Sequence, residues 1–113
     1  MQAVGPAPVT LINGATAPQP NPATYLDMRG ASALTVTVVG TFTGTVNFEC
    51  SVDAVTWWPL EMAQVAAKNQ VGTSTTNQSG WCLASPTPLM AFRATVPTLS
   101  AGSVTVVALA GRG

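Results

Sequence analysis

Hydrophobic and polar residues alternate with a period of two along much of this chain, which is the pattern of β-strands with one buried face. The alternation is clearest in residues 32–40, 45–51, 90–97 and 103–111. Glycine-containing stretches separate these segments and favour tight turns. The positions that we expect to face the core are Leu34, Val36, Val38, Val46, Phe48, Cys50, Phe92, Ala94, Val96, Val104, Val106 and Ala108.

The middle of the chain has a weaker pattern. Residues 59–70 have a loose helical spacing that begins at a proline, so a short helix is one interpretation and an irregular strand or loop is the one we favour. Residues 72–80 are polar and turn-forming and are expected to be a loop, whereas residues 80–86 predict another short strand. Seven or eight short strands indicate an all-β fold, a single antiparallel β-sandwich or jelly roll.

Residues 1–24 differ from the rest because they contain five prolines, which favour extended backbone and exclude a helix. A disordered tail is one interpretation. We favour an ordered, extended arm that binds a partner, with the sandwich domain in residues 25–113. The short apolar run at residues 9–12 would then pair with an exposed sheet edge of a neighbour. The expected contacts of this arm are Val9, Leu11, Ile12, Pro18 and Pro20.

Composition narrows the possible functions. The chain has 113 residues, of which 47% are hydrophobic and 7% charged, and four basic residues balance four acidic ones. Without a basic cluster we expect no nucleic-acid partner. No apolar stretch approaches the roughly 18 residues of a membrane span, and the first residues do not resemble a signal peptide. So little charge is typical of a protein that remains packed against other proteins.

The sequence offers little material for catalysis. Histidine is absent, so the usual general base is missing, and we expect no catalytic residue, no metal site and no cofactor. Glu49 and Asp53 are close enough in sequence for a glycosidase pair, but we expect Asp53 to cap a turn instead. We favour buried thiols over a disulfide for Cys50 and Cys82.

The stretch "SVDAVTWWPL", residues 51–60, resembles the Asp-box hairpin of β-propeller proteins, S-x-D-x-G-x-T-W. Ser51, Asp53, Thr56 and Trp57 match it in type, although one residue fewer separates Asp from Thr and the glycine is absent. This motif is a structural turn, so the resemblance implies no enzymatic activity.

A larger part of the chain resembles small β-sandwich proteins encoded by tailed bacteriophages. Those modules carry S-x-D-G-x-T-W between strands and end with an Arg-containing strand followed by S-G-x-V-T-V. The matching pieces here are residues 40–60, 92–94 and 102–106, with Ala54 in place of the usual turn glycine. The resemblance implies a protein of the virion, either a capsid decoration (cement) protein or part of a tail tip or fibre.

We therefore expect a non-enzymatic decoration protein on the outer capsid surface, where it binds the major capsid protein and forms a homotrimer. A carbohydrate- or receptor-binding module of a tail or fibre is the alternative.

Adjacent strand residues point to opposite faces, so Trp57 and Trp58 cannot both enter one core. By the resemblance Trp57 is structural, beside the Asp53 turn, and Trp58 then faces outward to contact a partner or a sugar.

Overall fold

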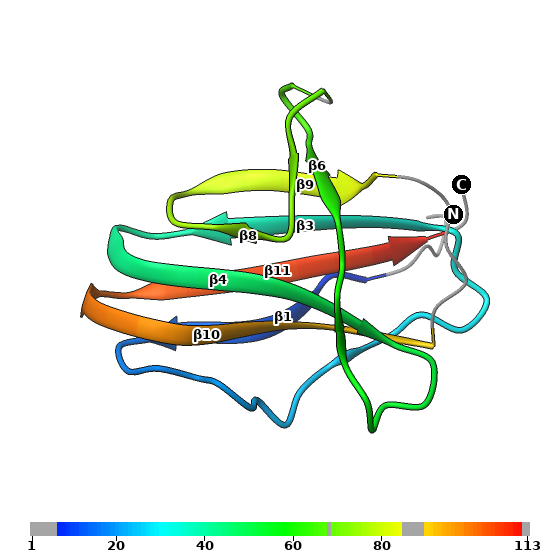
Figure 1. Cartoon of the computed structure of the whole chain (residues 1–113), viewed down its shortest axis with the longest axis horizontal. Coiled ribbons are helices and arrows are strands. Elements are labelled where there is room, and N and C mark those ends of the chain that lie inside the picture. Colours follow the sequence, from blue (N-terminus) through cyan, green and yellow to red (C-terminus); the bar gives the residue numbers. More distant parts are fainter. Residues whose placement is uncertain (1–6, 68, 85–89, 112–113) are drawn as a thin grey trace, which may run out of the picture.

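Two antiparallel β-sheets pack face to face in the computed structural model, which describes residues 7–67, 69–84 and 90–111 (Figure 1). The first sheet has six strands in the order β1-β11-β3-β9-β6-β7, and the second has the order β2-β10-β4-β5, with β8 also paired to β4. The strands are β1 (Val9–Ala15), β2 (Leu26–Asp27), β3 (Ala33–Val39), β4 (Phe42–Ser51), β5 (Trp58–Pro59), β6 (Met62–Gln64), β7 (Val71–Gly72), β8 (Ser74–Thr75), β9 (Ser79–Leu83), β10 (Ala91–Gly102) and β11 (Val104–Gly111). The predicted all-β sandwich is confirmed.

The core lies between the two sheets and is built by the alternating positions. Every position that the alternation assigned to the core is buried, except Cys50, which is half-buried. Two rings of the β4–β10 pair, Phe48 and Phe92, stack with centroids 6.4 Å apart. Two sheets that each bury one face against the other explain why these strands alternate so regularly.

Residues 59–67, 69 and 70 contain no helix. Leu60 and Met62 are buried, and β6 pairs with β9 in the first sheet, where Met62 lies opposite Leu83. This pairing stabilises extended backbone where the helical spacing was weak.

Residues 72–80 are not simply a loop, because they include the end of β7, the short strand β8 and the start of β9. No helix in the described part of the chain is long and apolar enough to cross a membrane.

The apolar run at residues 9–12 is part of the domain's own sheet. β1 pairs along β11, and Leu11 and Ile12 are 5% and 4% exposed within the common core. The register shifts between Thr10 and Ile12, so a bulge turns two consecutive side chains toward the core. The expected separation of residues 1–24 from the sandwich is therefore wrong for residues 9–15, whose hydrophobic side chains are covered by the chain itself.

Residues 16–24, here called the strap, lead from β1 of the first sheet to β2 of the second (Figure 1). Gln19 and Val96 exchange two backbone hydrogen bonds, N–H to O, of 2.7 and 2.8 Å, so the strap is bridged to β10. Pro18 and Pro20 flank this bridge and are exposed. Prolines lack an N–H donor, which suits a segment that makes one isolated bridge rather than a continuous ladder.

Candidate functional site

The Asp53 turn joins β4 to β5 and is held by side-chain oxygens. Ser51 Oγ accepts from the N–H groups of Asp53 and Ala54, at 3.1 and 2.8 Å, and donates to Asp53 Oδ1 at 2.9 Å. Asp53 Oδ1 also accepts from the N–H groups of Val55 and Thr56, at 2.9 and 3.0 Å. These N–H donors, followed by the Ser51 hydroxyl, lower the pKa of Asp53. Asp53 therefore organises a turn, as its sequence position indicated.

Trp57 follows this turn and lies on the outer side of the second sheet. Arg93 Cζ is 4.4 Å from the centroid of the Trp57 ring, and the Tyr25 ring is tilted by 60° at a centroid distance of 5.8 Å. Arg93 Nε donates to Glu49 Oε1 at 2.8 Å, and Arg93 Nη1 donates to Asn21 Oδ1 at 3.0 Å. Because Asn21 belongs to the strap and Tyr25 follows it directly, this cluster fixes the strap to β4 and β10.

Trp57 is thus half-buried in a surface cluster, whereas the tryptophan of the core is Trp81. The Trp81 ring lies 5.3 Å from that of Phe48, and its Nε1 donates to Ser79 Oγ at 2.7 Å. Trp81 lies in a short strand, where two or three alternating positions are too few to reveal a core residue. The sequence feature that could have indicated the position of Trp81 is Ser79, a polar residue two positions earlier on the same strand that can accept from the indole N–H.

Trp58, in β5, is 61% exposed, and the connection between β4 and β5 contains two other exposed hydrophobic residues, Val52 at 73% and Val55 at 78%. We call these three residues the corner residues. Trp58 lies opposite Cys50 in the β4–β5 pair, at the edge of the sheet. Trp58 is exposed, as expected, but not because it faces away from the core. Its pairing with Cys50 places it on the core-facing side of the second sheet, at the open edge, whereas Trp57 lies on the outer side with Arg93, so the expected faces of the two tryptophans are reversed.

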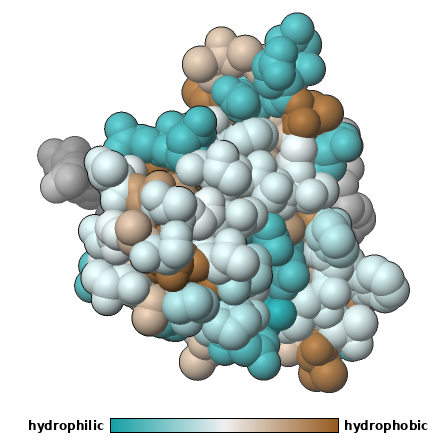
Figure 2. All heavy atoms as spheres, turned by 60° about the vertical axis from the view of Figure 1, so that its left-hand side comes forward, coloured by the Kyte–Doolittle hydropathy of each residue, from teal (hydrophilic) through white to brown (hydrophobic). Residues whose placement is uncertain are grey.

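A second exposed hydrophobic group occurs on the hairpin formed by β6 and β7. Val65 and Val71 are each about half exposed, and the hairpin projects from the body of the sandwich (Figure 1). On the face drawn in Figure 2, most of the surface has intermediate hydropathy, and hydrophobic residues occur in small separate groups. The exposed hydrophobic residues on this face thus form discrete groups rather than one broad apolar surface.

The residues predicted to bind a partner occupy three different environments. Leu11 and Ile12 are buried in the core, and Val9 is half-buried against it. Pro18, Pro20 and Trp58 are exposed. A partner that binds the folded domain can reach the prolines and Trp58, whereas Leu11 is covered.

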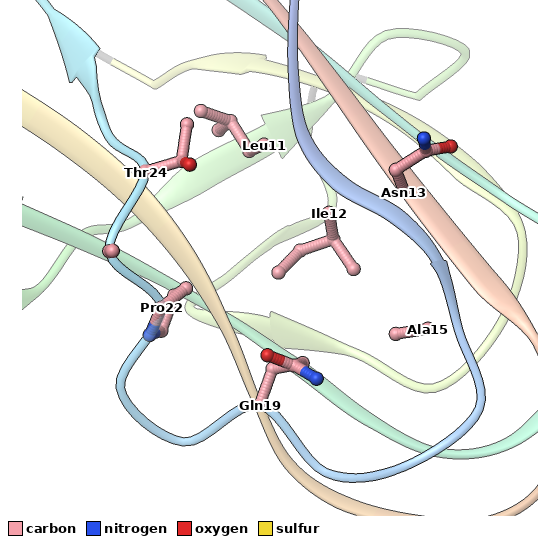
Figure 3. Close-up of a pocket in the computed structure, with 8 residues that line it drawn as sticks. Leu11, Ile12, Asn13, Ala15, Gln19, Pro22 and Thr24 are labelled. Atoms are coloured by element: carbon pink, nitrogen blue, oxygen red, sulfur yellow. The ribbon is translucent and has the colours of Figure 1, made fainter.

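A pocket of about 230 Å³ lies between β1 and the strap (Figure 3). Ile12 points from β1 toward the strap, and Pro22 and Gln19 face it from the other side. The lining residues are Leu11, Ile12, Asn13, Ala15, Gln19, Pro22, Ala23 and Thr24. None of them is charged.

The acidic groups and thiols of the described residues form no cluster of three or more that would hold a metal ion. Glu49 is engaged by Arg93 and Asp53 by its turn. Cys50 and Cys82 are both free and half-buried. Burial, with the neighbouring Glu49 charge, raises the pKa of the Cys50 thiol, which keeps it in its less reactive form.

Two solved structures share this fold. The SPBc2 prophage-derived protein YomS aligns with a TM-score of 0.79 and 17% identity, over 98% of this chain and 98% of its own. The PBSX exported protein XepA aligns with a TM-score of 0.76 and 16% identity, over 97% of this chain and 39% of its own. This chain thus spans about two fifths of XepA. No protein-family model and no curated protein matches the sequence.

At such low identity the likeness establishes the fold. The first neighbour is described as prophage-derived and the second as exported.

Proposed function

We propose that this chain is a non-enzymatic structural protein of a phage virion, and specifically a capsid decoration protein that binds the outer surface of the head. The observation that carries the proposal is the placement of exposed hydrophobic side chains. Of the seven exposed large hydrophobic residues in the described part of the chain, five are the corner residues and Val65 and Val71 of the β6–β7 hairpin. The sandwich that presents them is nearly uncharged. Apolar anchors on a rigid frame are typical of permanent protein–protein contacts.

The electrostatics of the site support a binding role rather than a catalytic one. Asp27 is paired with Arg29 at 2.7 Å, Glu49 with Arg93 at 2.8 Å, and Asp53 is held by its turn. A general acid or base needs a free proton position beside a substrate. The three carboxylates are instead used to hold the chain in shape.

Counting copies in purified phage particles tests the proposal. A decoration protein is expected in numbers comparable with the capsomers of the shell. A few copies per particle would indicate a tail component, and absence from particles, with the protein in the medium, would indicate an exported protein as XepA is described. Either result would contradict decoration of the head.

The hairpin is the surface that we assign to the shell. Replacing Val65 and Val71 by serine should leave the fold intact, because both side chains are half exposed, but should abolish attachment to heads that lack the protein. Leu109→Ser is the matched control, because Leu109 is exposed on β11, away from the hairpin. Equal loss of attachment in the control would argue against a specific hairpin contact.

A carbohydrate-binding module is the second candidate, and the exposed indole of Trp58 favours it. Stacking on a sugar needs a free aromatic face, and one face of Trp57 is already occupied by Arg93. Trp58 is the ring with most of its surface open. Binding to a glycan array that disappears in Trp58→Ala would favour this function over decoration.

A further inference from the structure

β1 contains the dipeptide Asn13-Gly14, and no other asparagine of the chain is followed by glycine. In such a dipeptide the backbone nitrogen of the glycine can attack the side-chain carbonyl carbon of the asparagine, because glycine has no side chain to hinder the approach. Both residues fall in the register shift between Ile12 and Ala15, where β1 forms no ladder pair with β11. The ladder therefore does not fix the geometry of this dipeptide.

The surroundings of the dipeptide leave the asparagine open and hold the glycine by one hydrogen bond. Asn13 is exposed, and its side chain extends from β1 on the side away from Ile12 (Figure 3). Gly14 N–H donates to Thr105 Oγ1 on β11 at 2.9 Å. Gly14 has a φ of 60°, although a Cβ there would meet no atom within 4 Å. The backbone conformation, and not a lack of space, thus favours glycine directly after an exposed asparagine.

We propose that Asn13 is a site of spontaneous deamidation and that the hydroxyl of Thr105 limits its rate. Gly14 N loses its proton to hydroxide and attacks Asn13 Cγ. A bond forms between these two atoms, the Cγ–Nδ2 bond breaks, and the nitrogen takes a proton from water and leaves as ammonia, so that a cyclic succinimide remains. Water then adds to one of the two ring carbonyls and opens the ring, which gives aspartate or isoaspartate. The net reaction consumes water and releases ammonia.

The hydrogen bond to Thr105 opposes this reaction in two ways. It occupies the Gly14 N–H, which must lose its proton before the nitrogen becomes a nucleophile. It also ties the backbone of the dipeptide to β11, whereas ring closure requires that backbone to rotate. Because the acceptor is a side-chain hydroxyl and not a backbone carbonyl, a substitution can remove it without breaking the ladder of the sheet.

The product would change β1 in two ways. Aspartate or isoaspartate at position 13 adds a negative charge to a chain whose formal net charge is zero. Isoaspartate also adds a methylene to the main chain directly after Leu11 and Ile12, which are buried in the core. The reaction needs only water, so it is a property of the isolated chain and does not depend on the proposed place of the protein in a virion.

Incubation of the isolated protein at mildly alkaline pH, followed by ion-exchange chromatography and peptide mapping by mass spectrometry, tests the proposal. Asn13 should convert before Asn47, Asn69 and Asn77, and Asn13→Gln should prevent formation of the acidic product. Thr105→Val should raise the rate of conversion by about 2- to 10-fold, as expected for the loss of one hydrogen bond. Thr105→Ser retains a hydroxyl and is the matched control, so its rate should stay close to that of the wild type.

Unfolding in urea separates the hydrogen bond from other effects of the substitution. In urea the wild type and Thr105→Val should convert at the same rate, because neither then holds the Gly14 N–H. Circular dichroism shows whether each variant is folded without urea, and Thr105→Ala replaces Thr105→Val if the latter is not. Earlier conversion of another asparagine, or a folded Asn13 that stays intact while the unfolded chain converts, overturns the assignment of the site. Equal rates in the folded wild type and Thr105→Val, or an equal rise in Thr105→Ser, overturn the role of the hydroxyl.

Discussion

Ala54 holds a left-handed backbone conformation, with φ of 60°, in the Asp53 turn. A Cβ is unfavourable there, and glycine avoids the strain at some cost in chain entropy. Ala54→Gly should therefore raise the free energy of unfolding by about 0.5–1 kcal/mol, measured by urea denaturation. Ala66→Gly, in the exposed β6–β7 connection, has no such strain to relieve and should stabilise nothing. A less stable Ala54→Gly would show that the turn tolerates alanine without strain.

The two adjacent tryptophans should respond differently to truncation. Trp57→Ala removes the stacking on Arg93 and the contact with Tyr25, and should cost about 1–3 kcal/mol in the free energy of unfolding. Trp58→Ala removes a side chain that is mostly in water and should stay within about 0.5 kcal/mol of wild type. Thermal melts of both variants check this. Equal destabilisation would place Trp58 in the domain's own core.

Two carboxylates make the fold sensitive to acid. Hydrogen bonds from the Arg29 side chain and backbone lower the pKa of Asp27 from 3.8 to about 2, and backbone N–H donors lower the pKa of Asp53. Because both pKa values are lower in the folded than in the unfolded state, their stabilising effect is complete above pH 3.8 and is lost as the pH falls toward 2. The melting temperature should fall over this interval, and less steeply in Asp27→Asn. Identical pH profiles would exclude a contribution from Asp27.

At the scale of elements, β1 should be essential to the fold. Ile12→Ala should lower the free energy of unfolding by about 2–5 kcal/mol, because it removes buried volume from the common core. Thr10→Ala, on the same strand but exposed, should change it by about 0.5 kcal/mol or less. A detachable arm would make both substitutions equally harmless to the isolated domain. Chemical denaturation of the two variants separates these cases.

The alternation of side chains was enough to predict β3, β4, β10 and β11, the four longest strands that follow β1 in the sequence. At positions such as Val36 and Val106 the pattern predicts burial directly, because a sheet covered on one face has hydrophobic residues at every second position. β1 was assigned to a partner because prolines surround it and because the strand that receives it, β11, is nearly a hundred residues away. Sequence pattern indicates that a strand exists, but it contains no information about which distant edge accepts it.

The candidate site was predictable in part. The role of Asp53 followed from turn chemistry. The exposure of Trp58 was predicted, but its cause is the position of β5 at the edge of the sheet and not the opposite faces of adjacent strand residues. The interactions of Trp57 did not, because Arg93, Tyr25 and Asn21 meet it only after β10 and the strap are in place. The pocket depends in the same way on the path of the strap across the two sheets.

At the scale of the whole molecule, the low charge has a consequence for assembly. If apolar contacts join the copies, raising sodium chloride should not dissociate them, because there is little Coulomb attraction to screen. The mass measured by light scattering should therefore be the same in dilute and in concentrated salt. Dissociation at high salt would instead indicate contacts that depend on exposed ion pairs such as Asp27–Arg29.

The position of β11 determines the order in which the sandwich can be completed. β11 lies between β1 and β3, both of which come much earlier in the sequence. During translation, β1 therefore has no neighbouring strand in its own sheet until residues 104–111 have left the ribosome. Until then its apolar side chains are not covered by the completed sandwich. Pairing of such distant segments is slow. The nascent chain should remain a client for chaperones until β11 has left the ribosome, and a product terminated before β11 should be cleared by proteases.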